Sequence, residues 1–139
     1  MRLDMTKSGD LPVPAKVCRQ IIDAARNAHP REACGLLLGR AGRVIEAREC
    51  RNVHPQSERH FEIDPQALID AHREEREGGP QILGYFHSHP SGEPSPSDTD
   101  RAMSAKDGKV WAIAGGDHLR FWQDNPQGFD ALSYEVIGT

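Results

Sequence analysis

The sequence lacks any apolar run close to the roughly 18 residues that a membrane-spanning helix requires. Its first ten residues hold no apolar segment of the kind found at the centre of a secretory signal. It has no run of lysine and arginine, and its net charge of −4 gives none of the positive character typical of nucleic-acid-binding proteins. We therefore expect a cytoplasmic protein that binds neither a membrane nor a nucleic acid.

Cysteine is also scarce. Cys18, Cys34 and Cys50 are the three present, and no two of them form a C-x-x-C pair. An odd count without such pairs argues against a disulfide framework and against a cysteine zinc finger. Because disulfides are rare in the cytosol, we expect three reduced and mostly buried thiols.

The chain of 139 residues is most simply a single domain. A chain of this length buries roughly 68% of its unfolded surface, enough for a core without disulfides or structural metals. Residues 1–10 are polar and are expected to form a flexible N-terminal tail. Residues 11–139 are expected to form the domain itself.

Apolar spacing and turn residues predict an α/β fold with a mixed sheet flanked by helices. Pro12 and Pro14 are expected to introduce a first helix that ends near Ala28. The other expected helices span 65–77 and 97–106, and the expected strands span 33–39, 44–49, 81–87, 110–114, 119–122 and 129–137. The strand at 81–87 is expected to be central.

The most informative pattern is His87-Ser88-His89 followed by Ser97 and Asp100, which reads H-x-H-x7-S-x-x-D. Side chains at positions i and i+2 of a strand point to the same face, so the two histidines would project together at the strand end. Asp100 would return from the start of the next helix. Two imidazoles and a carboxylate are a donor set for catalytic zinc, which keeps a fourth position for water.

Ser97 and Asp100 also have the spacing of a capping box, in which a serine begins a helix and an acid stands three positions later. This structural role does not exclude a functional one. Ser97 can cap the helix and still face the metal site.

A hydrolytic zinc site also needs a general base. Glu32 is one candidate, because it lies between Pro30 and a buried strand, where an acid is costly unless it has a partner or a task. Glu46, Glu62 and Glu93 are alternatives, and Glu93 is nearest in sequence to the histidines. Residue spacing alone does not choose among the four.

The segment EACGLLLG at 32–39, the segment GYFHSHP at 84–90, and then Ser97 and Asp100 resemble the JAMM motif of the JAB/MPN/Mov34 zinc metalloprotease family. The resemblance covers about residues 14–135, and all five motif positions are filled. It implies a cytidine-deaminase-like α/β fold and one catalytic zinc ion bound by His87, His89, Asp100 and a water. It also implies that Glu32 is the general acid/base, that Ser97 helps bind the oxyanion, and that no other cofactor is needed.

Members of this family cut peptide or isopeptide bonds, usually after the C-terminal Gly-Gly of ubiquitin-like proteins. The short chain resembles the compact prokaryotic branch. We therefore expect a zinc peptidase that hydrolyses a peptide bond at the C-terminal Gly-Gly of a ubiquitin-like, β-grasp sulfur-carrier protein. A diglycine tail suits a narrow groove because it has no side chains.

Three alternatives are kept. The first is an isopeptidase that removes a ubiquitin-like modifier from lysine, and the second is a phage-tail-type peptidase module. The third is a non-enzymatic scaffold that keeps zinc for folding. The scaffold has the least support, because a structural zinc site is closed and needs no base such as Glu32.

Overall fold

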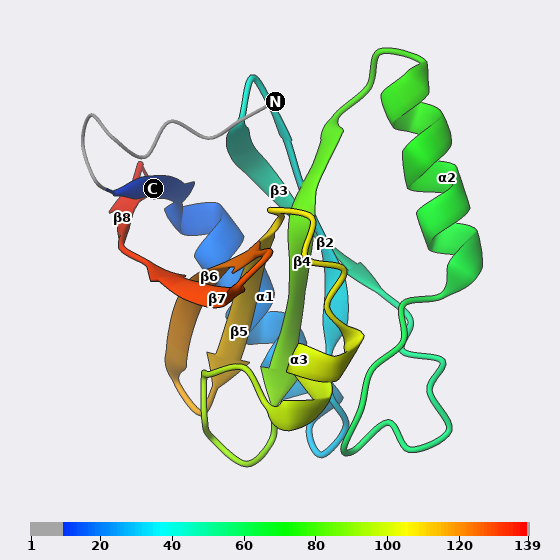
Figure 1. The fold of residues 1–139 in the computed structure, drawn as a ribbon, viewed down its shortest axis with the longest axis vertical. Coiled ribbons are helices and arrows are strands. Elements are labelled where there is room, and N and C mark those ends of the chain that lie inside the picture. Colours follow the sequence, from blue (N-terminus) through cyan, green and yellow to red (C-terminus); the bar gives the residue numbers. More distant parts are fainter. Residues whose placement is uncertain (1–9, 139) are drawn as a thin grey trace.

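A six-stranded mixed sheet forms the centre of the computed structural model, which describes residues 10–138 (Figure 1). The strand order is β3-β2-β4-β5-β6-β7. These strands are β2 (Cys34–Arg40), β3 (Arg43–Cys50), β4 (Gln81–His89), β5 (Val110–Gly115), β6 (His118–Asn125) and β7 (Gly128–Leu132). β4 and β5 run parallel, and the other neighbours are antiparallel. The expected central strand is confirmed, because β4 lies between β2 and β5.

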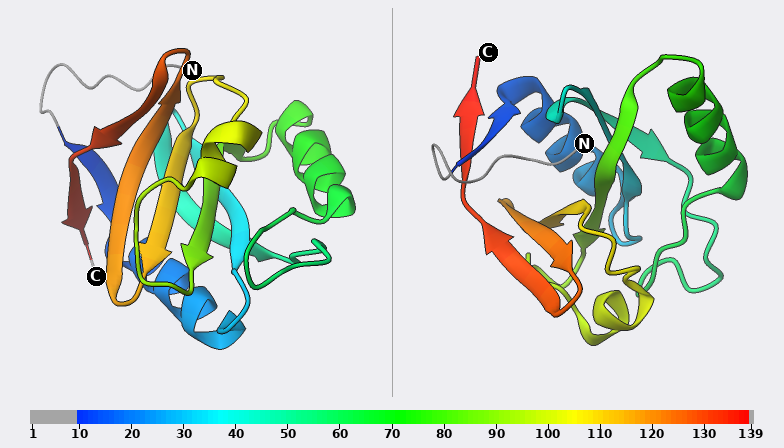
Figure 2. Two further views of the ribbon diagram at one scale, coloured as in Figure 1. Left: turned by 60° about the horizontal axis from the view of Figure 1, so that its bottom comes forward. Right: turned by 45° about the horizontal axis from the view of Figure 1, so that its top comes forward.

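Helix α1 (Ala15–Ala28) covers one face of this sheet, while α2 (Pro65–Arg76) and α3 (Asp98–Met103) lie on the other (Figures 1 and 2). α1 buries Val17 and Ile21 in the core that contains Phe86. Side chains alternate between the two faces of a strand. Phe86 therefore points toward α1, and its neighbour His87 points toward α2 and α3. No helix within residues 10–138 is long and apolar enough to cross a membrane.

The expected mixed sheet flanked by helices is confirmed, and the two ends of the described chain add a second, smaller sheet. β1 (Leu11–Pro14) pairs in parallel with β8 (Tyr134–Ile137). Residues 11–14 were expected only to introduce a helix, and 129–137 to form one strand. The late segment divides because Leu132 pairs with Phe121 of β6, whereas the Ser133 carbonyl accepts a hydrogen bond from the Leu11 amide at 2.8 Å.

The third helix is shorter than expected, since it ends at Met103 instead of near Lys106. Lys106 has a left-handed backbone conformation, with φ of 53°, and its amide donates to Asp124 Oδ2 at 3.1 Å. The chain has by then turned toward β6. All three cysteines are free, as expected. The expected tail, residues 1–10, lies outside the described residues except for Asp10.

Candidate metal centre

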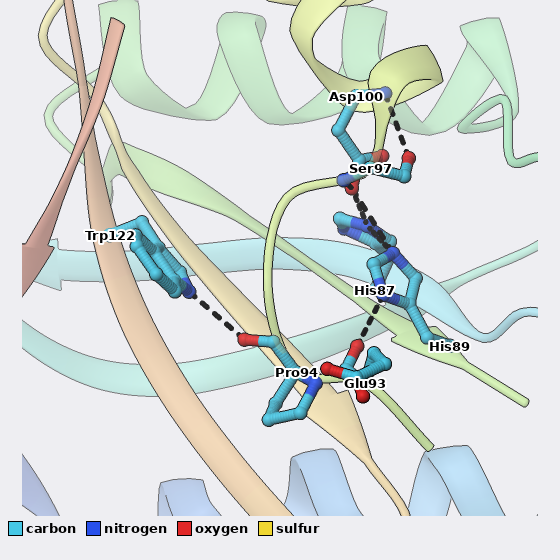
Figure 3. A network of polar contacts seen from close by, with 7 residues as sticks. All are labelled: His87, His89, Glu93, Pro94, Ser97, Asp100 and Trp122. Atoms are coloured by element: carbon cyan, nitrogen blue, oxygen red, sulfur yellow. Dashed lines mark hydrogen bonds and ion pairs between the residues drawn. The ribbon is translucent and has the colours of Figure 1, made fainter. Parts of the chain in front are cut away.

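Three donor atoms from two elements converge at the end of the central strand (Figure 3). His87 Nε2 lies 3.0 Å from His89 Nε2 and 3.0 Å from Asp100 Oδ2, and the remaining pair is 3.1 Å apart. All three side chains are buried. Zinc bonds of about 2.0–2.1 Å place tetrahedral ligands roughly 3.3 Å from one another. The donor set and its spacing therefore fit a tetrahedral metal ion.

His87 is held in place by packing. Its ring stacks on Phe61 with ring centroids 4.4 Å apart, and it packs edge to face with Trp111 with ring centroids 5.6 Å apart. Burial lowers the pKa of His87 and outweighs the opposing hydrogen bond to Asp100. The ring is therefore neutral at physiological pH, the form in which imidazole binds metals.

His89 is oriented instead by a hydrogen bond. Its Nδ1 donates to the carbonyl of Glu93 at 2.6 Å (Figure 3). Burial lowers the pKa of His89, but hydrogen bonds to Asp100 and to the Glu93 carbonyl outweigh burial and raise it. Because Nδ1 bonds to Glu93, Nε2 is the ring nitrogen that faces His87 and Asp100, and once it loses its proton it presents the lone pair that a metal ligand needs.

Asp100 belongs to both the helix and the site. Ser97 Oγ accepts from the Asp100 amide at 3.0 Å, and the Ser97 amide donates to Asp100 Oδ2 at 2.9 Å, so the predicted capping box is present. Burial works against ionisation of Asp100, but the hydrogen bonds from His87 and His89 hold its pKa well below the usual range. Asp100 is therefore an anion throughout the physiological pH range.

Glu32 reaches the site from the segment between α1 and β2. Its carboxylate lies within 4.8 Å of ring nitrogens of His87 and His89, and its side chain is only 6% exposed. Burial raises the pKa of Glu32 to about 7, although the charge of His89 opposes the rise. Of the alternatives, Glu46 pairs with Arg48 on β3 at 3.2 Å, and Glu93 supplies its backbone carbonyl to His89.

Two acids compete for the role of third metal ligand beside His87 and His89. One is Asp100 and the other is Glu32. The Asp100 oxygen is the closer and is ionised. Glu32, with a pKa of about 7, stands further away and exchanges a proton near neutrality. This difference favours Asp100 as a metal ligand and leaves Glu32 for proton transfer.

Two residues that support the site had no signal in the sequence apart from their polar character beside apolar strands. Ser88 Oγ accepts from the Ala33 amide at 2.8 Å, and the Ser88 amide donates to the Ala33 carbonyl at 3.0 Å. Asn52 Nδ2 donates to the Glu32 carbonyl at 3.0 Å. These bonds fix the backbone that carries Glu32 relative to the histidines.

Two hollows meet at the centre. One, of about 330 Å³, runs from Glu32 and Asp100 along the sheet face between α2 and α3, and much of its wall is apolar or aromatic: Phe61, Ile63, Leu68, Tyr85, Met103 and Trp111. The other, of about 480 Å³, is lined by Glu32, His89, Ser97 and the segment around Ser91 and Glu93. The donor atoms therefore lie where a substrate chain can reach them.

Comparison with curated proteins gives three informative relatives. A desampylase of Haloferax volcanii is 32% identical over 68% of this chain and 70% of its own length. A desampylase of Pyrococcus furiosus is 31% identical over 74% of this chain and 72% of its own. A probable TtuB-protein conjugate cleaving protease of Thermus thermophilus is 38% identical over a shorter stretch, 51% of this chain and 47% of its own.

Solved structures share the fold. A protein of Desulfitobacterium hafniense superimposes with a TM-score of 0.81 at 28% identity, over 92% of this chain and 93% of its own. A JAB1/MPN domain protein of Archaeoglobus fulgidus superimposes with a TM-score of 0.63 at 21% identity, over 92% and 100%. The model of the prokaryotic homologues of the JAB domain matches residues 14–125. The chain belongs to this family of prokaryotic JAB-domain homologues and is a hydrolase of the JAMM type.

Proposed function

We propose that this protein is a zinc-dependent peptidase that releases a ubiquitin-like protein from its conjugates by hydrolysing the amide bond after a C-terminal diglycine. The observation that carries the proposal is the convergence of three donor atoms 3.0–3.1 Å apart with a buried, titratable Glu32 beside them. A metal site used only for folding would not need that second acid.

His87, His89 and Asp100 would hold the ion. Zinc, when bound there, supplies Lewis-acid polarisation of the scissile carbonyl and activation of water. Two neutral imidazoles and one carboxylate suit zinc among the common divalent ions. Asp100 brings the negative charge, and the Glu93 carbonyl keeps the His89 ring turned toward the ion.

Glu32 would take the proton from the attacking water on a carboxylate oxygen and pass it to the departing amine. A pKa of about 7 suits both steps, because the group accepts and releases a proton at nearly equal cost near neutral pH. Ser97 Oγ accepts from the Asp100 amide, so its own O–H is left to donate. That hydrogen bond would stabilise the oxyanion of the tetrahedral intermediate.

The apolar hollow between α2 and α3 would hold the substrate tail. It begins at Glu32 and Asp100 and continues to Tyr85 and Trp111, so a tail lying in it would present its last residues to the metal. Glycine at the last two positions would bring no side chain into this entrance and would let the tail lie close to the donor atoms. The ubiquitin-like partner that we propose is a β-grasp sulfur carrier.

A conjugate is favoured as the substrate because one relative is named for cleaving protein conjugates. The second candidate is hydrolysis of a linear peptide bond that follows the diglycine, as first expected from the sequence. It is supported by the short connection over the site, where only residues 90–97 separate β4 from α3. Such a short connection leaves room for an unstructured peptide beside the metal site, but it offers little surface to bind a second folded protein.

The first experiment tests the enzyme itself. We expect Glu32→Gln to keep the fold and the bound zinc and to lose nearly all peptidase activity, because the amide cannot accept a proton. Glu46→Gln is the matched control, since Glu46 pairs with Arg48 away from the centre. Cleavage by the Glu32→Gln protein at the wild-type rate would remove Glu32 as the base. Full zinc occupancy in His89→Ala, measured by elemental analysis, would remove His89 from the ligand set.

The second experiment tests the bond. The same sulfur carrier is prepared as a lysine conjugate and as a linear fusion to a peptide, and products are followed by mass spectrometry. We expect release from the conjugate with a free diglycine carboxylate. Cleavage of the linear fusion alone would favour the second candidate, and cleavage of neither would contradict the proposed substrate class.

A further inference from the structure

The segment between β4 and α3 is fastened to the sheet by a residue that is not one of the metal donors. Trp122, on β6, donates from its indole Nε1 to the carbonyl of Pro94 at 3.1 Å (Figure 3). Trp122 contacts no metal-donor atom in this arrangement. Its bond ties the middle of the connecting segment to a strand that is two places away from β4 in the sheet.

Gly115, on β5, allows the segment between β4 and α3 to pack closely against the sheet. A Cβ atom at this position would lie 2.7 Å from the Glu93 carbonyl carbon and the Pro94 nitrogen and 2.8 Å from the Gly92 carbonyl carbon. Real Cβ atoms essentially never approach backbone atoms so closely. Gly115 is also the register partner of His89 across the β4–β5 pair. The connecting segment therefore packs directly against the backbone of Gly115, next to the metal centre.

The carbonyl next to the one that Trp122 binds belongs to Glu93, and it accepts from His89 Nδ1 at 2.6 Å. The Gly92 amide in turn donates to the His89 carbonyl at 3.0 Å, which closes a turn over the histidine. Consecutive carbonyl groups are thus fixed from opposite sides, one by the Trp122 indole and one by the His89 ring. A shift of Pro94 would move the acceptor that orients His89.

We propose that Trp122 is a positioning residue for the metal centre: by holding the Pro94 carbonyl, with the segment seated on Gly115, it keeps the Glu93 carbonyl against His89 Nδ1. This inference rests on the proposed function in one respect, because it takes His89 to be a metal ligand. It assigns to Trp122 no contact with substrate or ion.

The expected loss of zinc affinity depends on how many bonds separate Trp122 from the metal site. Loss of a group that hydrogen-bonds directly to a ligating histidine costs about 10–100-fold in metal affinity. Trp122 acts one residue further out, through the peptide between Glu93 and Pro94. We therefore expect its loss to weaken zinc affinity about 3–10-fold.

The test compares Trp122→Phe and Gly115→Ala with the wild-type protein. Trp122→Phe keeps an aromatic ring and removes the N–H donor, whereas Gly115→Ala displaces the segment and leaves Trp122 intact. Tyr134→Phe is the matched control, because the Tyr134 hydroxyl donates to the Leu119 carbonyl of the same strand β6 at 2.8 Å without touching the segment. Zinc affinity is measured by competition with a chromophoric chelator. The His89 tautomer is read in the metal-free protein from imidazole nitrogen chemical shifts.

We expect both test variants to bind zinc about 3–10-fold more weakly and to show a smaller population of the Nδ1–H tautomer of His89, while Tyr134→Phe matches the wild type. Unchanged zinc affinity and tautomer in a folded Trp122→Phe protein would overturn the proposal, and so would an equal loss in Tyr134→Phe. If Trp122→Phe does not fold, a folded Gly115→Ala with wild-type affinity overturns it. His89→Ala distinguishes failure of the ligand assignment from failure of the role of Trp122. Full zinc binding by His89→Ala refutes His89 as a ligand. Loss of zinc binding by His89→Ala, together with wild-type zinc affinity in Trp122→Phe, refutes only the role of Trp122.

Discussion

The side-chain amide of Asn52 donates a hydrogen bond to the backbone carbonyl of Glu32 across twenty positions of sequence. The same amide donates to the His60 carbonyl at 3.0 Å, and its oxygen accepts from the amides of His54 and Glu62 at 3.0 and 3.1 Å. One asparagine thus shapes the segment 52–62 and attaches it to the residue that we propose as the base.

Asn52→Ala is expected to lower the free energy of unfolding by about 2–3 kcal/mol, because several backbone groups lose their partner at once. It is also expected to lower kcat, since the Glu32 backbone is released. Urea unfolding measures the first effect. Gln66→Ala is the control, because the Gln66 side chain bonds to the exposed carboxylate of Asp70 within α2, and its loss should change stability by less than about 0.5 kcal/mol. An Asn52→Ala protein as stable as the wild type would show that these hydrogen bonds contribute nothing to the free energy of unfolding.

Ser97→Gly separates the two roles of Ser97. Glycine at a helix N-cap costs only a few tenths of a kcal/mol relative to serine, so stability should hardly change. The hydroxyl is lost, however, and removal of one oxyanion donor lowers kcat about 10²–10³-fold. Steady-state kinetics and thermal unfolding on the same preparation provide the check. Wild-type kcat would restrict Ser97 to capping.

The pH dependence of stability in the metal-free protein follows from Glu32. Its pKa is about 7 in the fold against an ordinary 4.5, so between these values the folded chain binds more protons than the unfolded chain. The resulting stabilisation is fully present below pH 4.5, falls as pH rises through about 7, and amounts at most to roughly 3 kcal/mol. Urea unfolding with a chelator present, from pH 5 to 8, should show wild type losing stability relative to Glu32→Gln. A difference between the two proteins that is independent of pH would contradict this prediction.

The thiol of Cys34 should be unreactive toward alkylating reagents in the folded protein. It is fully buried, and burial raises the pKa of its thiol to about 12. Because the thiolate is the reactive form, iodoacetamide at pH 8 should leave Cys34 unmodified and the activity intact. Peptide mass spectrometry after labelling, with urea-unfolded protein as the positive control, gives the answer. Rapid labelling of native Cys34 together with inactivation would contradict this prediction.

The local pattern was enough to predict the central strand and the three side chains that converge at its end, His87, His89 and Asp100. Strand alternation placed His87 and His89 on one face, and the S-x-x-D spacing placed Asp100 at N3 of α3. Choosing Glu32 over Glu46 and Glu93 from the sequence required the family resemblance, because the approach of Glu32 to the histidines depends on β2 pairing with β4. That pairing joins residues some fifty positions apart and leaves no local signal.

The features that were missed are likewise products of distant contacts. Leu11–Pro14 has two prolines in four residues and becomes a strand only because β8 offers a partner. Nothing around Trp122 in the sequence indicates that its N–H reaches the carbonyl of Pro94. Asn52 looks like an ordinary loop residue until the segments that it joins are seen together. In each case the deciding partner is remote in sequence.

The pairing of β1 with β8 has a consequence for synthesis on the ribosome. Leu11 and Val13 are among the first residues of the described chain and belong to the core under α1, but Tyr134, which packs against that core, is among the last. The metal donors and Trp122 all emerge before Tyr134–Ile137 does. On the ribosome, every donor residue of the candidate metal centre is therefore synthesised before the strand that closes the layer beneath α1.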